Sequence, residues 1–78
     1  MKGRIMPDKS YKIIEVVGVS TESIQQAVRN AIKKASETLR NLDWFEVAEI
    51  RGAIGKKAEP TFQVTVRVGF RLEGGPID

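Results

Sequence analysis

The side chains best suited to binding are an aromatic ring and an amide on two different segments. Trp44 is the only tryptophan of the chain, and it lies where a helical pattern gives way to an alternating one, out of phase with the neighbouring apolar positions. An indole that faces away from its own core needs a partner, either another subunit or a flat ligand. Gln63 follows on an alternating segment. Its amide can match the paired donor and acceptor edge of a heterocycle, a hypothesis that gains weight if Trp44 lies nearby.

These two residues also have simpler interpretations. Trp44 could be a tryptophan buried between subunits, and Gln63 could be a solvated polar residue. Arg51, Arg67 and Arg71 lie on or near the same two predicted strands. Arginines there usually protect a sheet edge, although two of them beside an aromatic ring would suit a phosphate. The basic stripe of the predicted helix is most simply a solvated face; it consists of Lys33, Lys34 and Arg40.

Catalysis is the least favoured class of function. The chain has no cysteine and no histidine, which removes the usual nucleophile and base pairs and the commonest zinc ligands. Asp43, Glu46 and Glu49 have no spacing typical of a catalytic pair. Gly52 and Gly55 do not lead into a helix, so neither belongs to a phosphate-binding loop. We therefore expect a binding protein and not an enzyme.

The size of the chain predicts a single small domain that gains stability from self-association. It has 78 residues and a net charge of +3, and a chain this short buries only about 60% of its unfolded surface. The mild positive charge suits phosphorylated small molecules as readily as nucleic acid. No apolar run is long enough for a membrane span or a signal peptide, so we expect a cytoplasmic protein that does not bind membranes.

The order of the hydrophobic patterns predicts one helix among three strands. A β-branched run at 11–17 indicates a strand that stops at Gly18, and Ser20 and Thr21 offer a helix cap. Apolar residues then recur at three- and four-residue spacing as far as Leu42, which predicts an amphipathic helix of about twenty residues. Residues 44–54 form a second predicted strand, whose alternation slips near Ala48 and Glu49 and so indicates a bulge. Residues 62–72 alternate strictly and predict the third strand.

This order predicts an α+β fold. The β-α-β-β succession allows a three-stranded antiparallel sheet wrapped around one amphipathic helix. The sheet face away from the helix stays partly apolar and the sheet edges stay open, which again favours self-association.

Four segments together resemble the dodecin family. They are Tyr-Lys-Ile-Ile-Glu-Val-Val-Gly at 11–18, Thr-Leu-Arg-Asn-Leu-Asp-Trp-Phe-Glu-Val at 38–47, Glu-Ile-Arg-Gly at 49–52 and Phe-Gln-Val-Thr-Val-Arg-Val-Gly-Phe-Arg-Leu-Glu at 62–73. The resemblance implies a dodecin-like domain at 10–73, between an N-terminal extension at 1–9 and a C-terminal tail at 74–78. It also implies a hollow homododecamer of cubic symmetry that stores and sequesters flavin and limits its photochemical damage.

The resemblance further implies roles for particular residues. Trp44 matches the tryptophan that stacks on flavin between neighbouring subunits, and Gln63 matches the glutamine that hydrogen-bonds the pyrimidine edge of the ring. Arg51 and Arg71 match arginines associated with FMN in bacterial members, with riboflavin and FAD as other candidate flavins. Some members also bind coenzyme A, and the corresponding positions here include Lys9, Tyr11, Lys12, Lys34, Thr38 and Arg40.

Two alternatives to flavin binding stay open. The first is a small basic module that binds RNA or single-stranded DNA on its sheet, which would need two or three exposed aromatic residues on central strands. Phe62 and Phe70 fall on the predicted core face, which leaves Trp44 nearly alone and weakens this alternative. The second is a structural shell with no ligand.

Overall fold

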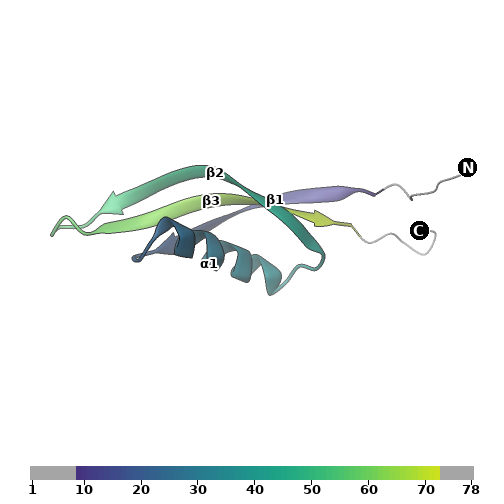
Figure 1. Cartoon of the computed structure of the whole chain (residues 1–78), viewed down its shortest axis with the longest axis horizontal. Helices are drawn as coiled ribbons and strands as arrows, with labels where there is room; N and C mark the ends of the chain where they lie inside the picture. Colours follow the sequence, from purple (N-terminus) through teal and green to yellow (C-terminus); the bar gives the residue numbers. More distant parts are fainter. Residues whose placement is uncertain (1–8, 73–78) are drawn as a thin grey trace, which may run out of the picture.

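Three strands and one helix make up the described part of the chain. The computed structural model describes residues 9–72. The elements are β1 (Tyr11–Ser20), α1 (Ile24–Ser36), β2 (Leu42–Ile54) and β3 (Pro60–Arg71). The strands form one sheet in the order β1-β3-β2, with both outer strands antiparallel to β3, and α1 lies against one face (Figure 1). The predicted α+β fold is confirmed, and the predicted extension and tail lie outside the described residues apart from Lys9.

Small residues allow α1 to lie very close to the sheet. Ala27, Ala31 and Ala35 are the buried residues of the helix. A Cβ at Gly18 would collide with the carbonyl oxygen of Ala27. Gly18 therefore marks a close approach of helix and strand inside β1. The predicted end of the first strand at Gly18 was wrong, because β1 continues to Ser20.

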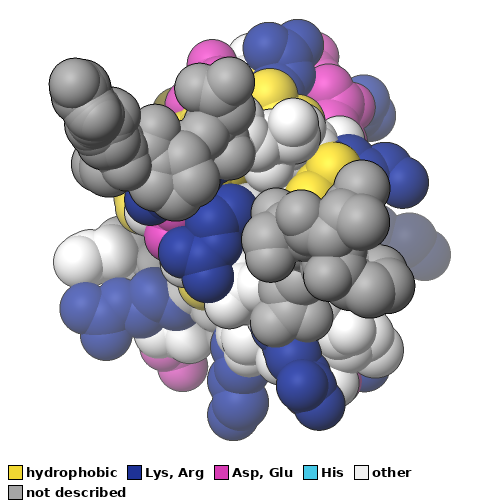
Figure 2. All heavy atoms as spheres, turned by 90° about the vertical axis from the view of Figure 1, so that its right-hand side faces the viewer, with side chains coloured by type: hydrophobic (Ala, Val, Ile, Leu, Met, Phe, Trp, Pro, Cys, Tyr) yellow, Lys and Arg dark blue, Asp and Glu magenta, His cyan; other side chains and the backbone are white. Residues whose placement is uncertain are grey.

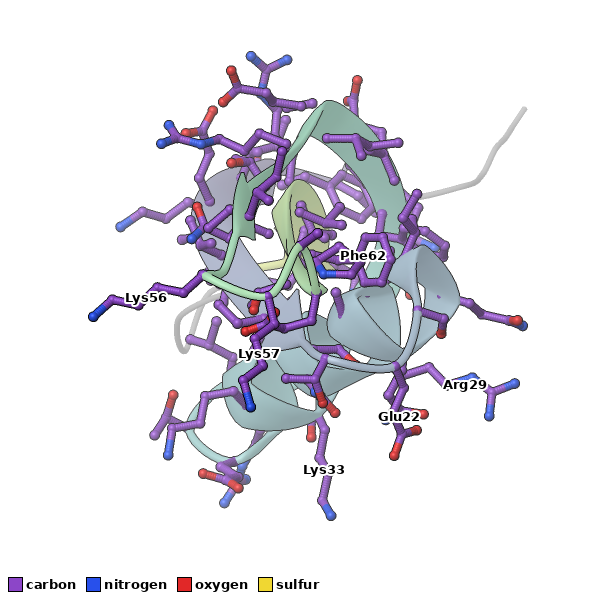
Figure 3. The ribbon with its side chains drawn as sticks, turned by 90° about the vertical axis from the view of Figure 1, so that its left-hand side faces the viewer. Glu22, Arg29, Lys33, Lys56, Lys57 and Phe62 are labelled. Carbon is purple, nitrogen blue, oxygen red and sulfur yellow. The ribbon has the colours of Figure 1, made fainter. Side chains whose placement is uncertain are left out.

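The core lies between α1 and the two strands that the helix covers. Val64, Val66 and Val68 of β3 are at most 1% exposed. The buried alanines of α1 complete this cluster, and partly buried hydrophobic residues pack around it: Ile14, Val16, Val28, Ile32, Leu42 and Phe62. Figure 3 shows Phe62 beside α1, whereas Arg29 and Lys33 of the helix point away from the sheet.

The helix begins at a different cap from the one predicted. The Ser23 hydroxyl accepts a hydrogen bond of 2.9 Å from the Gln26 amide, and Ser23 is the N-cap. The prediction of Ser20 or Thr21 as the cap was therefore wrong. The Ser20 hydroxyl instead accepts a hydrogen bond of 2.9 Å from the Glu22 amide, which stabilises the turn before the helix.

The helix is also shorter than predicted, with 13 residues instead of about twenty. It ends at Ser36, and residues 37–41 turn the chain back toward the sheet. Asn41 has a φ of 63°, in the left-handed region that asparagine tolerates better than most residues. Leu42 then packs against the core from β2. Apolar residues beyond α1 thus continue the helical spacing without continuing the helix.

Two irregularities in β2 decide which of its side chains face the helix. The register with β3 shifts between Val47 and Glu49, as the slip in alternation predicts, and also between Leu42 and Trp44. Between the two shifts, Phe45 pairs with Val68, whereas Trp44 pairs with Gly69. The two neighbours in sequence consequently lie on opposite faces of the sheet.

The helix leaves much of the apolar surface of β2 uncovered. The inner strip, which we define as Phe45, Val47, Ile50 and Ile54, lies on the helix side of the sheet, and each member is between 42% and 82% exposed. The hairpin of β2 and β3 extends beyond α1 and ends near Lys56 and Lys57, whose side chains point outward (Figures 1 and 3). A single chain therefore exposes apolar surface that another chain could cover.

Candidate functional site

The aromatic residues meet on the outer face of the sheet, the face away from α1. Tyr11 pairs with Arg71 across β1 and β3, and Trp44 pairs with Gly69 across β2 and β3. The ring centroids of Tyr11 and Trp44 are 5.0 Å apart, with an angle of 58° between the rings. This geometry is favourable for an aromatic pair. We call Tyr11, Trp44 and Gly69 the aromatic platform.

The platform is partly open to solvent. Trp44 is 41% exposed and Tyr11 is 39% exposed. Trp44 therefore faces away from its own core, as its phase in the sequence predicts, and offers part of its indole to a partner. A small hollow of about 130 Å³ adjoins the indole and has mainly apolar walls; its lining residues are Ile32, Leu42, Asp43, Trp44, Phe45 and Val68.

The surroundings of Tyr11 favour its neutral form. Partial burial of the phenol raises the pKa of Tyr11 above its usual 10.0, and the nearby carboxylate of Asp43 raises the pKa further. The positive charge of Arg71 acts in the opposite direction. Asp43 and Arg71 thus lie close enough to the platform to influence it electrostatically.

The turn before β2 holds Arg71 beside the platform. The Arg71 amide donates a hydrogen bond of 3.0 Å to the Asn41 carbonyl oxygen. The Asn41 side-chain amide donates in return to the Arg71 carbonyl oxygen at 3.4 Å. This exchange fixes the start of β2 against the end of β3.

A second group of polar residues lies farther along the outer face. Gln63 pairs with Arg51 on one side and with Val19 on the other. Gln63 is half-buried, whereas Arg51 is exposed. An amide and a guanidinium side by side can bind a polar ring edge and an anionic group. We call Gln63 and Arg51 the amide–arginine pair.

An ion-pair ladder separates the amide–arginine pair from the platform. Arg67 Nε lies 3.0 Å from Glu15 Oε2, and Arg67 Nη1 lies 4.0 Å from Glu46 Oε2. The Glu15 carboxylate accepts a hydrogen bond from Arg67 and raises the pKa of its guanidinium. Arg67 is therefore engaged by two carboxylates, which makes it a poor phosphate ligand.

One chain does not bring all the predicted flavin residues together. Gln63 and Gly69 are six residues apart on β3, which corresponds to about 20 Å along an extended strand. Trp44 lies over Gly69 and is accompanied by Arg71, whereas Gln63 is accompanied by Arg51. A position of Gln63 near Trp44, which would have strengthened the hypothesis for Gln63, is thus not found within one subunit. A ligand that touches Trp44 and Gln63 of the same chain would have to span this distance.

The residues predicted for coenzyme A are all exposed. Lys9, Tyr11 and Lys12 lie at or before the start of β1, while Thr38 and Arg40 lie in the turn after α1. Both segments lie toward the right-hand end of the molecule in Figure 1. Figure 2 views the molecule from that side and shows many Lys and Arg side chains around its outline. Lys34, near the end of α1, forms an ion pair of 3.3 Å with Glu37.

Sequence reasoning missed two residues of the site, Gly69 and Asp43. The six-membered ring of the indole lies over Gly69, and the Asp43 side chain lies near Tyr11 and raises the pKa of its hydroxyl. A signal for Gly69 was present, because an isolated glycine in a strictly alternating strand often marks a close approach. Within residues 9–72, no three acidic side chains gather as a candidate metal site, and no helix is long and apolar enough to cross a membrane.

Comparison with known proteins gives several dodecins. A curated dodecin from Thermus thermophilus is 52% identical over 65 residues, which cover 83% of this chain and 94% of the relative. A calcium dodecin from Mycobacterium tuberculosis is 26% identical over 62 residues, with 80% of this chain and 87% of the relative covered.

Solved structures agree with these sequence matches. A Thermus thermophilus crystal structure has a TM-score of 0.83 at 50% identity and covers 87% of this chain and 100% of its own. A dodecin from Streptomyces davaonensis has the same TM-score at 47% identity, with the same coverage. The model of the Dodecin family matches residues 10–73, and the chain therefore belongs to the dodecin family.

Proposed function

We propose that this protein binds a flavin of the FMN type without a covalent bond, and that it stores, sequesters and photoprotects the flavin in a cytoplasmic homododecamer. The observation that carries the proposal is the half-exposed indole of Trp44, held flat on a sheet face that the chain's own helix does not cover. Riboflavin and FAD share the same flat ring and would use the same platform.

The chemistry of the aromatic platform, of the amide–arginine pair and of Arg71 fits the parts of a flavin mononucleotide. The indole suits a flat ring through offset stacking. The amide of Gln63 suits a ring edge that both donates and accepts hydrogen bonds. The guanidinium groups of Arg51 and Arg71 suit a phosphate. Trp44 would also supply an electron to a photoexcited flavin, which is the basis for the proposed photoprotection.

The distance between the two groups supports an assembled form. Because Trp44 and Gln63 lie about 20 Å apart along the sheet, the platform of one subunit has to meet the amide–arginine pair of another. The inner strip supplies exposed apolar surface for such contacts. Dodecins are oligomeric binders of small ligands, and the homododecamer is the form we propose here.

Coenzyme A is a second ligand in this proposal. Three basic residues, Lys9, Lys12 and Arg40, lie in segments that meet at one end of the sheet, where they suit phosphate groups. Lys34 is less suited to this role because Glu37 already pairs with its ammonium group.

Binding of RNA or single-stranded DNA is less well supported. The outer face carries Glu15, Glu46 and Glu49 beside its arginines, and two of these carboxylates pair with Arg67. Mixed charge of this kind attracts a polyanion weakly.

The calcium named for the Mycobacterium tuberculosis relative belongs to that protein. A ligand-free shell would be distinguished by purified protein that neither retains nor binds flavin.

Titration of FMN into ligand-stripped protein tests the proposal, with flavin fluorescence as the measurement. We expect saturable quenching in the wild type, and a large loss of affinity in Trp44→Ala and in Gln63→Ala. Thr61→Ala, two residues before Gln63 on the same face of β3, is a matched control and should bind as the wild type does. Unchanged affinity in both test variants would refute the proposal.

A further inference from the structure

The glycine beneath the indole is not required by its own backbone. Gly69 pairs with Ile13 on one side and, next to the first register shift of β2, with Trp44 on the other. Its φ is outside the left-handed region where glycine is favoured. A residue with a side chain could therefore adopt the same backbone conformation. Strand propensity would also favour such a residue over glycine.

The space above Gly69 is filled by the ring of Trp44. A Cβ at Gly69 would lie 2.6 Å from Trp44 Cη2 and closer still to Cε2 and Cζ2, whereas ordinary contacts are 3.4–4 Å. Gly69 is buried although it lies on the outer face. The six-membered ring of the indole thus rests directly on the backbone of β3.

We propose that Gly69 is a positioning residue that sets the depth and tilt of the Trp44 indole, and thereby the fit of the flavin that stacks on it. This inference rests on the proposed flavin function. A methyl group at residue 69 would lift the ring by about 1 Å or more, because carbon atoms pack at about 3.5–4.0 Å. The lifted ring would also change its contact with Tyr11, which lies 5.0 Å away between ring centroids.

A lifted indole would place the stacking surface at the wrong height for the other flavin contacts. The amide of Gln63 lies on a rigid strand, about 20 Å from Gly69 along that strand. In the proposed site, the amide of Gln63 meets the aromatic platform of another subunit. A shift of the indole in one subunit is therefore not accompanied by a matching shift of Gln63. A shift of about 1 Å in a preorganised site is enough to weaken binding considerably.

The first test needs no ligand, because Trp44 is the only tryptophan of the chain. In ligand-free assembled protein, Gly69→Ala should raise the accessibility of the indole to acrylamide and shift its emission to longer wavelength. In an FMN titration, the same variant should bind about tenfold more weakly, in line with the loss of one well-made aromatic stack. Thr65→Val, on the same face and strand, is the control and should leave both measurements unchanged.

A second variant separates ring position from general damage. Phenylalanine lacks the fused ring that lies over Gly69, so Trp44→Phe should remove most of the collision. In the Trp44→Phe background, Gly69→Ala should weaken FMN binding by less than about threefold. If Gly69→Ala alone fails to assemble, recovery of assembly in the double variant supports the proposal, and failure to recover overturns it.

The outcomes also separate this inference from the proposed function. Unchanged tryptophan emission and FMN affinity in Gly69→Ala would overturn the role of Gly69. Absence of FMN binding in the wild type would instead refute the proposed function. In that case the emission of the ligand-free variant would still show whether Gly69 sets the position of the indole.

Discussion

Particles assembled from two variants that each bind flavin weakly should regain flavin binding if the site lies between subunits. Trp44→Ala subunits keep Gln63, and Gln63→Ala subunits keep Trp44. The two groups lie about 20 Å apart in one chain, so each site needs the platform of one subunit and the amide of another. In randomly mixed particles at equal ratio, about one quarter of such sites receive both intact residues.

The exposed part of the indole gives the size of the effect. Trp44 is 41% exposed, which for a side chain of about 250 Å² leaves about 100 Å² for a ligand to cover. At about 25 cal/mol per Å², this burial contributes about 2.5 kcal/mol, and stacking adds about 1 kcal/mol. Trp44→Ala should therefore weaken FMN binding by about two and a half orders of magnitude, which corresponds to about 3.5 kcal/mol. Gln63→Ala should cost about 1–3 kcal/mol.

Co-expression of two differently tagged variants, followed by two-step purification, gives the mixed particles. FMN titration at a concentration near the wild-type Kd then counts the restored high-affinity sites. Particles of either variant alone, and an equal mixture of pre-assembled particles, are the controls. If the mixed particles bind no better than these controls, Trp44 and Gln63 do not form a site between subunits, and the reasoning from strand register is refuted.

Three further predictions concern packing, ionisation and assembly. Gly18→Ala should lower the free energy of unfolding by about 1–3 kcal/mol in denaturant titrations, because the new methyl group collides with the carbonyl of Ala27. The pKa of Tyr11 is raised in the folded state, so its contribution to stability is present below pH 10.0 and is lost as the pH rises through the folded pKa. Tyrosinate absorbance of this single tyrosine should therefore appear at higher pH in folded than in unfolded protein. Asp43→Asn should reduce the difference between the folded and unfolded pKa of Tyr11. Ile50→Lys, in the exposed inner strip, should dissociate the assembly in size-exclusion chromatography with light scattering.

Each of these predictions has a control or an outcome that would contradict it. Val17→Ala removes methyl groups beside Gly18 on the opposite face and should not perturb the contact with the helix. Gln25→Lys places the same charge as Ile50→Lys on an exposed position of α1 and should leave the assembly intact. Coincident tyrosinate titrations in folded and unfolded protein would contradict the partial burial of Tyr11 and the influence of Asp43 on its pKa. An intact Ile50→Lys assembly would show that the inner strip is not an interface.

The local pattern of the chain was sufficient for the fold class and for the face of its key aromatic residue. Strict alternation in the third strand predicts which valines are buried, since side chains alternate between the two faces of a strand. The slip near Ala48 predicts the bulge, and the phase of Trp44 predicts its outward direction. These features depend on neighbours in sequence, and for that reason they can be read without the structure.

Element boundaries were less predictable, because tertiary contacts decide them. The apolar spacing runs past the end of α1, since Leu42 reaches the same core from a strand. Gly18 resembles a stop signal in sequence, but its missing side chain accommodates the helix within a continuing strand. In both cases contacts with a segment far away in the sequence determine where the element ends. A local sequence pattern carries no information about such contacts.

The composition of the site likewise divides between sequence and tertiary structure. The sequence by itself determined the residue types: one tryptophan, a glutamine with the chemistry of a ring edge, and arginines suited to phosphate. Only the folded sheet showed that Trp44 rests on Gly69, that Arg67 is held by two carboxylates, and that Gln63 lies about 20 Å from the indole along β3. The physical reason is strand register: it depends on hydrogen bonds between segments far apart in the chain, and it determines which side chains can share one ligand.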